Sequence, residues 1–390
     1  MKKIHVFHLI DGLTFGGAET LLRDLAAGLE KRGYEITVAY STHGAFVQEL
    51  ENKGIKLKQI PRLGLIDPIF LLRIFAILRQ SKPDVVHTHL FKSDFHGRLA
   101  ARLAGVPVVV STLHNNDVWA NNKILGYIYG LTALWVDRLI AVSPEVKDFH
   151  IQKTFVSPEK ITVIQNGVDV EAFSGHNNDA QQARKDFGFT PTQPVFGIIG
   201  RLMPQKNVSM FLHAAVEILR SQPDARFLIV GDGELRTKLE AQAKDLGLLP
   251  SVIFTGMRKD IPIILNAIDV LVLSSLWEGL PVILLEAMAA SRPVVSTAVD
   301  GVLGVVEPDV TAILTPKEDA SALAKACIKL ARDSELRKKM GYQGHQRVLK
   351  SYSLSYMIDC IAKLYQELLS LKNKHISTHS PDKVDGKAKE

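Results

Sequence analysis

Two carboxylates, Glu278 and Glu286, lie on either side of a predicted helix start in the second half of the chain. Between them, Gly279 allows a ligand to approach the backbone closely, and Pro281 suits the first helical position. The free amides at such a start favour a phosphate. Because Glu286 lies about 7.5 Å further along the helix, one carboxylate could bind hydroxyls on each side of a diphosphate. The alternative is an N-terminal capping charge and a solvated helix residue.

Two cations follow a predicted strand at residues 195–199. Arg201 and Lys206 share one loop, where they could neutralise a departing diphosphate. Arginine would do so with bidentate geometry and lysine as a point charge. In isolation they could equally be ordinary surface residues. Their place at the carboxyl end of a strand, where open α/β sheets bind ligands, favours an anion site.

Glycine pairs follow strands in both halves of the chain. Gly16 and Gly17 open a predicted helix, so a ligand could lie against their backbone, and Gly231 and Gly233 end a later strand. Each pair could also be a plain tight turn. Neither fits the fingerprint G-x-G-x-x-G, which disfavours a nicotinamide cofactor.

His114 lies in a loop just past the strand predicted at residues 106–111. It could hydrogen-bond a ligand hydroxyl or lie beneath a reacting carbon, or it could be a hydrogen-bonded loop residue. His87 and His89 alternate on one strand without a third ligand at suitable spacing, which favours structural roles. Asp94 is a candidate acid or base, although a helix N-cap explains it better. No loop carries an Asp-x-Asp pair suited to a metal-bound diphosphate, so we expect no metal and no cofactor.

The elements that must position these residues follow a βαβ pattern, which indicates α/β domains with parallel sheets. Strands are predicted in the first half at residues 4–10, 36–40, 84–88, 106–111, 139–142 and 161–164, and in the second at 195–199, 226–230, 252–255, 270–273, 293–296 and 312–314. We therefore predict domains at residues 1–165 and 193–353, joined by a linker at 166–192. A helix at about 354–371 and a disordered tail at 372–390 complete the chain.

Composition is that of an ordinary globular protein, with 46% hydrophobic and 23% charged residues in a chain of 390. The net charge of +6 fits an anionic substrate, an anionic membrane surface or plain surface composition. No dense basic block with interleaved aromatics indicates nucleic-acid binding. The apolar residues after Lys3 break at Asp11, which predicts a strand and not a signal peptide. With Cys327 and Cys360 as buried thiols, we expect a cytoplasmic protein.

Membrane contact is a separate question. The apolar window at residues 68–78 is interrupted by Arg73 and is too short to span a bilayer. Leu71, Phe75 and Leu78 could line a lipid-facing patch, although their helical spacing is more typical of a core.

Taken in order, the motifs resemble those of the glycosyltransferase group 1 family (family 4, GT-B fold) over nearly the whole chain. The features that carry the resemblance are Gly16-Gly17-Ala18-Glu19, Gly200-Arg201 with Lys206, Gly231-Asp232-Gly233, and the pair Glu278 and Glu286. The resemblance implies two Rossmann-like parallel-sheet domains facing a cleft, with a C-terminal helix that crosses back to the N-terminal domain. The N-terminal domain would bind the acceptor and the C-terminal domain the donor.

The implied reaction is a retaining, metal-independent transfer from a nucleotide-diphosphate sugar, with UDP-sugars favoured, to a glycan or lipid-linked acceptor. The residues implied in catalysis are His114, Glu278, Arg201 and Lys206. The residues implied in donor binding are Gly16, Gly17, Gly200, Arg201, Lys206, Gly231, Met257, Arg258, Glu278, Gly279, Leu280, Val282 and Glu286. The implied context is bacterial surface-polysaccharide or lipid-linked oligosaccharide synthesis, in the cytoplasm or peripherally at the inner face of the cell membrane. Alternatives are a nucleotide-sugar epimerase on the same scaffold and a catalytically silent subunit.

Overall fold

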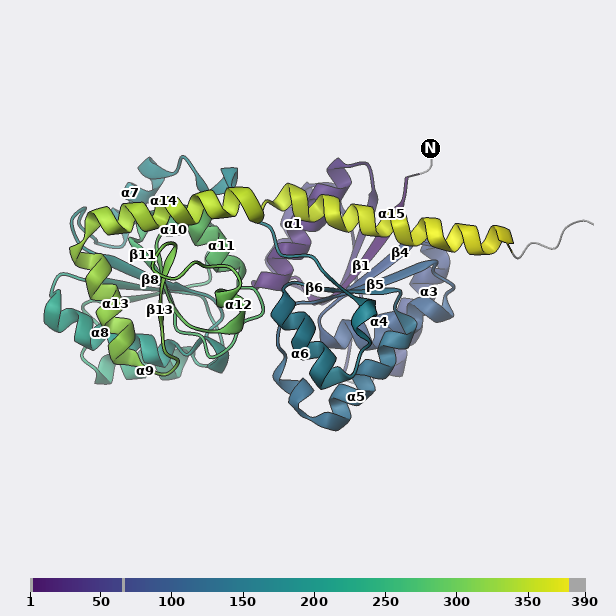
Figure 1. Ribbon diagram of the computed structural model, residues 1–390, viewed down its shortest axis with the longest axis horizontal. Helices are drawn as coiled ribbons and strands as arrows, with labels where there is room; N and C mark the ends of the chain where they lie inside the picture. The colour runs from purple at the N-terminus through teal and green to yellow at the C-terminus, as the bar shows by residue number, and fades with distance from the viewer. Residues whose placement is uncertain (1–2, 65–66, 379–390) are drawn as a thin grey trace, which may run out of the picture.

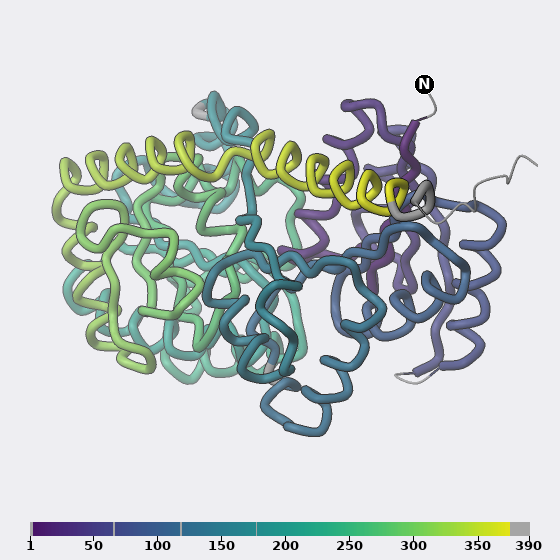
Figure 2. The backbone as a smooth tube through the Cα atoms, turned by 45° about the vertical axis from the view of Figure 1, so that its right-hand side comes forward, coloured from purple at the N-terminus to yellow at the C-terminus, as the bar shows by residue number. Residues whose placement is uncertain are grey.

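The computed structural model describes residues 3–64 and 67–378. It has two lobes, each a parallel sheet flanked by helices, and a long helix, α15 (Leu354–Thr378), runs along one side (Figure 1). The view turned by 45° shows the same division and the same position of α15 (Figure 2). The two parallel sheets confirm the fold class predicted from the βαβ pattern.

In the described residues the first lobe has a seven-stranded parallel sheet of order β3-β2-β1-β4-β5-β6-β7. Its strands are β1 (His5–Gly12), β2 (Glu35–Thr42), β3 (Lys56–Gln59), β4 (Val85–His89), β5 (Val108–Leu113), β6 (Arg138–Ala141) and β7 (Ile161–Val163). Its α-helices are α1 (Gly17–Lys31), α2 (Phe46–Asn52), α3 (Pro68–Ser81), α4 (Phe91–Leu103), α5 (Lys123–Thr132) and α6 (Pro144–Thr154). The order reverses between β1 and β4, which is where such sheets bind ligands.

The second lobe has a six-stranded parallel sheet of order β10-β9-β8-β11-β12-β13 across the part of the chain that is described. Its strands are β8 (Val195–Ile199), β9 (Arg226–Val230), β10 (Val252–Gly256), β11 (Val270–Leu273), β12 (Val294–Thr297) and β13 (Ala312–Thr315). The helices are α7 (Asn177–Asp186), α8 (Val208–Ser221), α9 (Arg236–Asp245), α10 (Ile261–Ala267), α11 (Val282–Ala289), α12 (Asp300–Leu303), α13 (Ala320–Arg332) and α14 (Ser334–Ser351). The strand order of this sheet reverses between β8 and β11.

The central strands are buried along nearly their whole length, because helices cover both faces of each sheet. All five residues of β8 and all five of β4 are buried. One cluster of buried apolar side chains continues across the junction and includes Val142 and Val168 as well as Leu280 and Leu284. The two lobes therefore share part of their core, which fixes the loops that face each other.

The chain returns to the first lobe through α15. Val168 pairs with Ser353 in an isolated parallel bridge just before the helix begins. Along α15, Asp359 forms an ion pair with Arg32 of α1 at 2.6 Å, and Tyr365 is completely buried. The helix extends to Thr378 and not to about residue 371, so the prediction of a disordered tail was wrong for residues 372–378. The rest of that predicted tail, residues 379–390, lies outside the described residues.

Among the strands and α-helices of the first lobe, β3, α2 and α6 escaped prediction. The strand β3 has four residues, of which Lys56, Lys58 and Gln59 are exposed. It lies at the edge of the sheet, where polar side chains replace the apolar run that marks a buried strand. The helix α2 has only seven residues. In α3, Leu78 is buried and Leu71 and Phe75 pack against the same core cluster, so these side chains do not form a lipid-facing patch.

Candidate active site

Loops at the carboxyl ends of both sheets meet where the lobes join. The tightest approach is at Gly279, where an added methyl group would lie 2.3 Å from the His114 carbonyl oxygen. Ser143 donates a hydrogen bond to the Gly279 carbonyl at 3.3 Å, and Asn166 donates one to the Leu280 carbonyl at 3.2 Å. Gly279 is thus required for the two loops to touch, and this requirement does not depend on a ligand.

Glu278 is nearly buried and held from several sides. Its Oε1 accepts hydrogen bonds from Lys206 Nζ at 2.5 Å and Ser275 Oγ at 2.6 Å. Its Oε2 accepts one from Gln205 Nε2 at 3.3 Å, and Gln205 also donates to the Trp277 carbonyl at 2.9 Å. Lys206 is therefore not a free cation, because the Glu278 carboxylate balances its charge.

Arg201 is the more accessible of the two predicted cations, with 48% of its side chain exposed. It links the lobes: Nη2 donates to the Phe15 carbonyl at 3.3 Å and lies 3.5 Å from Glu19 Oε1. Burial raises the pKa of Glu19, and the guanidinium of Arg201 opposes that shift. Arg201 accordingly presents a positive charge at the junction while its other contacts anchor it to the first lobe.

The predicted glycines differ in how closely other atoms approach them. An added methyl on Gly231 would lie 1.9 Å from the Gly200 carbonyl oxygen, and Gly231 has a φ of 135°. The Gly231 amide also donates to the Gly256 carbonyl at 2.9 Å, so the ends of β8, β9 and β10 meet backbone to backbone. Across the junction, a methyl on Gly17 would lie 3.5 Å from Val282 Cγ2. On Gly16 the methyl would lie 2.3 Å from the carboxylate of Glu19 within the same helix.

Glu286 faces the first lobe from α11. Burial raises the pKa of its carboxyl to about 7; the nearby Asp24 adds to the shift and Arg23 opposes it. Arg23 and Asp24, both on α1, are hydrogen-bonded to each other at 2.7 Å. Because its carboxyl group titrates near neutrality, Glu286 is a candidate functional group.

The loop after β10 contains Met257 and Arg258, two of the residues predicted to bind the donor. Met257 is 56% exposed. Arg258 donates two hydrogen bonds to Asp260, at 2.8 and 2.6 Å, and its guanidinium lies 5.9 Å from the ring centre of Phe187. The Arg258 side chain is thus occupied, whereas the backbone at Gly256 lies beside Gly231.

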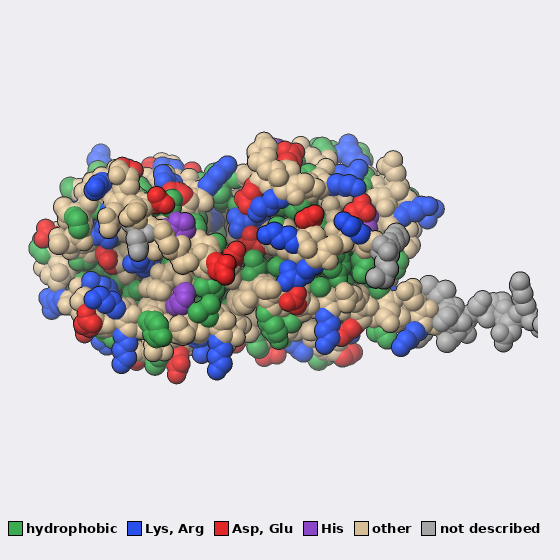
Figure 3. All heavy atoms as spheres, turned by 90° about the horizontal axis from the view of Figure 1, so that it is seen from above, with side chains coloured by type: hydrophobic (Ala, Val, Ile, Leu, Met, Phe, Trp, Pro, Cys, Tyr) green, Lys and Arg blue, Asp and Glu red, His purple; other side chains and the backbone are tan. Residues whose placement is uncertain are grey.

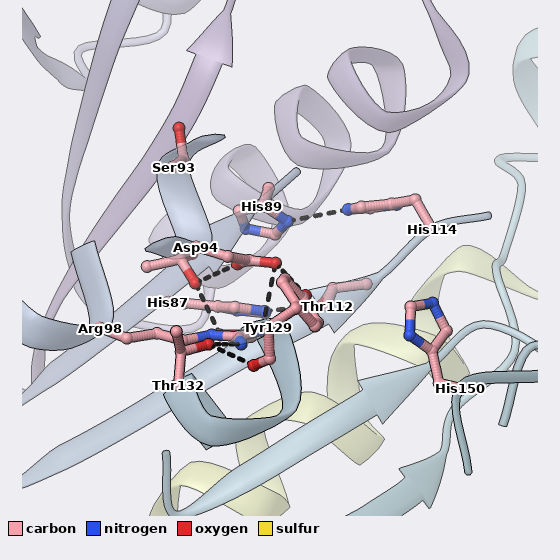
Figure 4. Close-up of polar contacts among 12 residues, drawn as sticks. His87, His89, Ser93, Asp94, Arg98, Thr112, His114, Tyr129, Thr132 and His150 are labelled. Carbon is pink, nitrogen blue, oxygen red and sulfur yellow. Dashed lines mark hydrogen bonds and ion pairs between the residues drawn. The ribbon is translucent and has the colours of Figure 1, made fainter. Parts of the chain in front are cut away.

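Three histidines form a chain that begins at the junction, and Figure 4 shows the hydrogen bond between the first two, His114 and His89. His114 Nε2 lies 3.1 Å from His89 Nδ1, and His89 Nε2 lies 3.1 Å from His8 Nδ1. Burial lowers the pKa of His114 to about 4 and that of His8 to about 3. Burial also lowers the pKa of His89, so all three rings are neutral at pH 7, and the two hydrogen bonds couple the tautomers of the rings that they join.

The same region contains the one group in the described residues whose ligand atoms lie close enough for a metal ion. His8, His87 and His89 are buried with these atoms within 4.8 Å of one another. His8 is the third ligand that the sequence did not reveal, because it comes from β1, where it pairs with His87 of β4. Both nitrogens of His87 are hydrogen-bonded, to Tyr365 at 2.5 Å and to Thr112 at 2.7 Å. These bonds account for the arrangement without an ion.

Asp94 is not a helix N-cap, so that interpretation was wrong: the N-cap of α4 is Leu90. The Asp94 side chain is buried, lies 3.1 Å from Arg98, and accepts hydrogen bonds from Tyr129 and Thr88 at 2.5 Å each (Figure 4). A carboxylate so fully paired has little capacity left to act as an acid or base. We regard this group as a structural network within the first lobe.

Two polar residues near the junction were not singled out in the sequence, and Glu19, although part of the glycine-rich motif, was assigned no contact. Ser275 follows β11 as an ordinary small residue. Asp117 follows His114 by three positions, and burial raises its pKa to about 7. Only three-dimensional proximity distinguishes such residues from ordinary loop residues.

Comparison with known proteins places this geometry in context. Residues 15–172 match the family model described as Glycosyltransferase Family 4, and residues 179–347 match the one described as Glycosyl transferases group 1. The chain is 34% identical over 307 residues to the UDP-Gal:alpha-D-GlcNAc-diphosphoundecaprenol alpha-1,3-galactosyltransferase of Escherichia coli, covering 77% of this chain and 79% of that relative. It is 27% identical to the putative glycosyltransferase EpsF of Bacillus subtilis, and the match covers 90% of this chain and 96% of that relative.

Solved structures show the same fold. HepE of Anabaena, crystallised with UDP-glucose, superimposes with a TM-score of 0.85 at 23% identity, covering 93% of this chain and 100% of that one. WaaG, a glycosyltransferase involved in lipopolysaccharide biosynthesis, superimposes with a TM-score of 0.75 at 19% identity. The superposition covers 93% of this chain and 99% of that one. The predicted GT-B arrangement of two facing parallel-sheet lobes is confirmed.

Proposed function

We propose a specific reaction for this chain, which belongs to the glycosyltransferases of group 1 and family 4 and is an enzyme of that class. It transfers a sugar from a nucleotide-diphosphate sugar, with a UDP-sugar as the favoured donor, to a glycan or lipid-linked acceptor. The anomeric configuration is retained and no metal takes part. The observation that carries the proposal is the junction itself, where Arg201, Glu278, Glu286 and His114 come from facing loops and helices. The E. coli relative, which by its name uses UDP-Gal and a diphosphoundecaprenol-linked acceptor, supports the choice of substrates.

On the donor side, the accessible guanidinium of Arg201 binds the diphosphate and offsets its charge as it departs. Lys206, held in place by its ion pair with Glu278, donates a further hydrogen bond to the diphosphate. Glu286 accepts hydrogen bonds from the ribose hydroxyls, and Glu278 faces the transferred sugar. The remaining donor contacts come from the backbone at Gly16, Gly17, Gly200, Gly231, Met257, Arg258, Gly279, Leu280 and Val282.

During transfer, the bond between the anomeric carbon and the phosphate oxygen breaks, and the acceptor hydroxyl oxygen bonds to the same face of that carbon. The departing diphosphate takes the acceptor proton. His114, neutral and fixed by His89, hydrogen-bonds a hydroxyl of the sugar ring. Arg201 and Lys206 bind the departing diphosphate through their N–H groups, in the place where a metal ion would otherwise be needed.

The test measures the release of nucleoside diphosphate from each of a panel of nucleotide sugars. Each donor is assayed with and without a lipid-linked glycan acceptor, and each of these reactions is repeated in the presence of a chelator. We expect acceptor-dependent release that the chelator does not affect, and NMR of the product should show the donor's anomeric configuration. Conversion of the donor to another sugar without release of diphosphate would instead identify an epimerase. Absence of both reactions, with donor still bound, would indicate a silent subunit.

None of the helices in the described residues is long and apolar enough to cross a bilayer. On the face seen in Figure 3, Lys and Arg side chains are interspersed with Asp and Glu. The basic surplus is therefore not gathered into a single patch on that face. We propose that the enzyme works in the cytoplasm and contacts the inner face of the cell membrane peripherally.

A further inference from the structure

Glu19 is a buried carboxylate in the first turn of α1, beside the junction between the lobes. This end of α1 borders the second lobe, since a methyl added to Gly17 would lie 3.5 Å from Val282 of α11 (Figure 1). A buried carboxylate has lost most of its hydration, so it needs hydrogen bonds and opposite charges in return. At Glu19 these come in part from groups that are also proposed to bind the donor's diphosphate.

The Glu19 carboxylate is held by groups from both lobes. Its Oε1 accepts a hydrogen bond from Thr14 Oγ1 at 3.2 Å and lies 3.5 Å from Arg201 Nη2. Its Oε2 lies over the glycine-rich turn, where it is the nearest atom to a methyl group added to Gly16. The same methyl would lie 3.1 Å from Arg201 Nη2. The carboxylate, the guanidinium and the backbone of Gly16 therefore converge at one point of the junction.

The ion pair between Glu19 and Arg201 matters more to the carboxylate than to the guanidinium. Burial raises the pKa of Glu19, and the charge of Arg201 is the strongest influence that lowers it again. In the part of the chain that the structure describes, Arg201 is the cation that forms an ion pair with Glu19. Arg201 itself is 48% exposed on its side chain, so an anion from solvent can reach it. The pair can therefore exchange its partner from the side of Arg201.

The start of α1 gives Glu19 a second feature in common with a diphosphate. The helix begins at Gly16 without a capping side chain, and Glu19 is the acidic residue of its first turn. Negative charge is favourable at this end of a helix, where the amides and the dipole are positive. The backbone of Gly16 and Gly17 is also proposed to contact the donor's phosphates. Glu19 thus places a negative charge beside both of the groups that a diphosphate would use.

We propose that the Glu19 carboxylate competes with the diphosphate of the nucleotide for Arg201 and for the start of α1. This inference rests on the proposed function, in which those two groups bind the diphosphate. One guanidinium cannot fully pair with both anions, and two anions held side by side repel each other. Binding of the nucleotide therefore takes Arg201 away from Glu19, and the reverse exchange speeds the release of nucleoside diphosphate. Glu19 is a positioning residue that acts through Arg201 and lowers the affinity for the nucleotide.

The experiment is calorimetric titration of the full chain with UDP. The variants are Glu19→Gln, Arg201→Ala and the two combined. Glutamine has the size of glutamate and can still accept a hydrogen bond from Thr14, but it carries no charge. The matched control is Glu30→Gln, which removes the same charge from an exposed position about 16 Å further along α1.

Glu19→Gln should bind UDP about fivefold more tightly than wild type, as expected for the loss of a competing, partly exposed ion pair, and the control should bind as wild type does. In the Arg201→Ala background, the same substitution should leave the affinity unchanged. A Glu19→Gln variant that binds UDP as wild type does, or more weakly, would overturn the proposal, and weaker binding is the result expected of a merely structural residue. A gain that persists in full without Arg201 would also overturn it, because the carboxylate would then repel the diphosphate directly.

The transfer assay separates this inference from the proposed function. In that assay, about one fifth of the UDP concentration that inhibits wild type should inhibit the Glu19→Gln enzyme equally. Sugar transfer by wild type together with equal UDP affinities of wild type and Glu19→Gln would contradict the competition alone. The predicted differences in UDP affinity without any sugar transfer would contradict the proposed function and leave the competition in place.

Discussion

Replacing Gly279 by alanine should open the junction between the lobes. The added methyl would lie 2.3 Å from the His114 carbonyl oxygen. Because a carbon–oxygen contact normally measures about 3.3–3.6 Å, the two loops must separate by about 1 Å. Displacement of this size between reacting groups lowers catalytic rate about 100-fold, or about 2.7 kcal/mol of transition-state stabilisation.

The assay is kcat/KM for acceptor-dependent release of nucleoside diphosphate, accompanied by thermal unfolding to show that the variant is folded. Gly64→Ala is the matched control, because a methyl there meets no atom within 4 Å. The control should keep wild-type activity. A Gly279→Ala enzyme within about threefold of wild type would refute the claim that the closed junction positions the reacting groups.

Affinity for a UDP-sugar should rise about tenfold from pH 6 to pH 8, because the pKa of Glu286 is raised to about 7 and its carboxylate must be ionised to accept ribose hydroxyls. Calorimetry measures this, and Glu286→Gln should remove the pH dependence; a flat wild-type profile would contradict the assigned role. Lys206→Met leaves the buried charge of Glu278 unpaired and should lower the free energy of unfolding in urea by about 3 kcal/mol, and adding Glu278→Gln should restore stability but not activity. Equal stability of the single variant and wild type would argue against the ion pair. His89→Phe removes the hydrogen bond that orients the His114 ring, so kcat should fall about tenfold at unchanged donor affinity; an unchanged kcat would exclude this positioning role.

The apolar strands of both sheets were predictable, since a strand covered on both faces must be apolar along its length, as β8 and β11 are. The edge strand β3 was not, because exposure removes that constraint and leaves a polar segment. The extension of α15 to Thr378 also escaped prediction: the segment from Lys372 is rich in polar and charged residues. Lys372 itself reaches Asp137 at 2.8 Å, a contact between distant parts of the chain.

For the candidate site, the family resemblance implied a site between the two lobes, and the structure brings Gly279 to His114 and Arg201 to Glu19. The pairing within the site was not predictable. Lys206 is bound to Glu278, 72 positions away, and nothing local in the sequence indicates that contact. The histidine chain was missed for the same reason, since His8 comes from a different strand than His89.

The most direct test of the central claim is a thermal-shift measurement of the wild-type chain against a panel of nucleotide sugars. If the junction binds such a donor, at least one UDP-sugar at about 100 times its Kd should raise the Tm by about 5 °C. Glu286→Ala and Arg201→Ala should each remove most of that shift. A wild-type Tm that no nucleotide sugar changes would contradict the claim that this junction is a donor site.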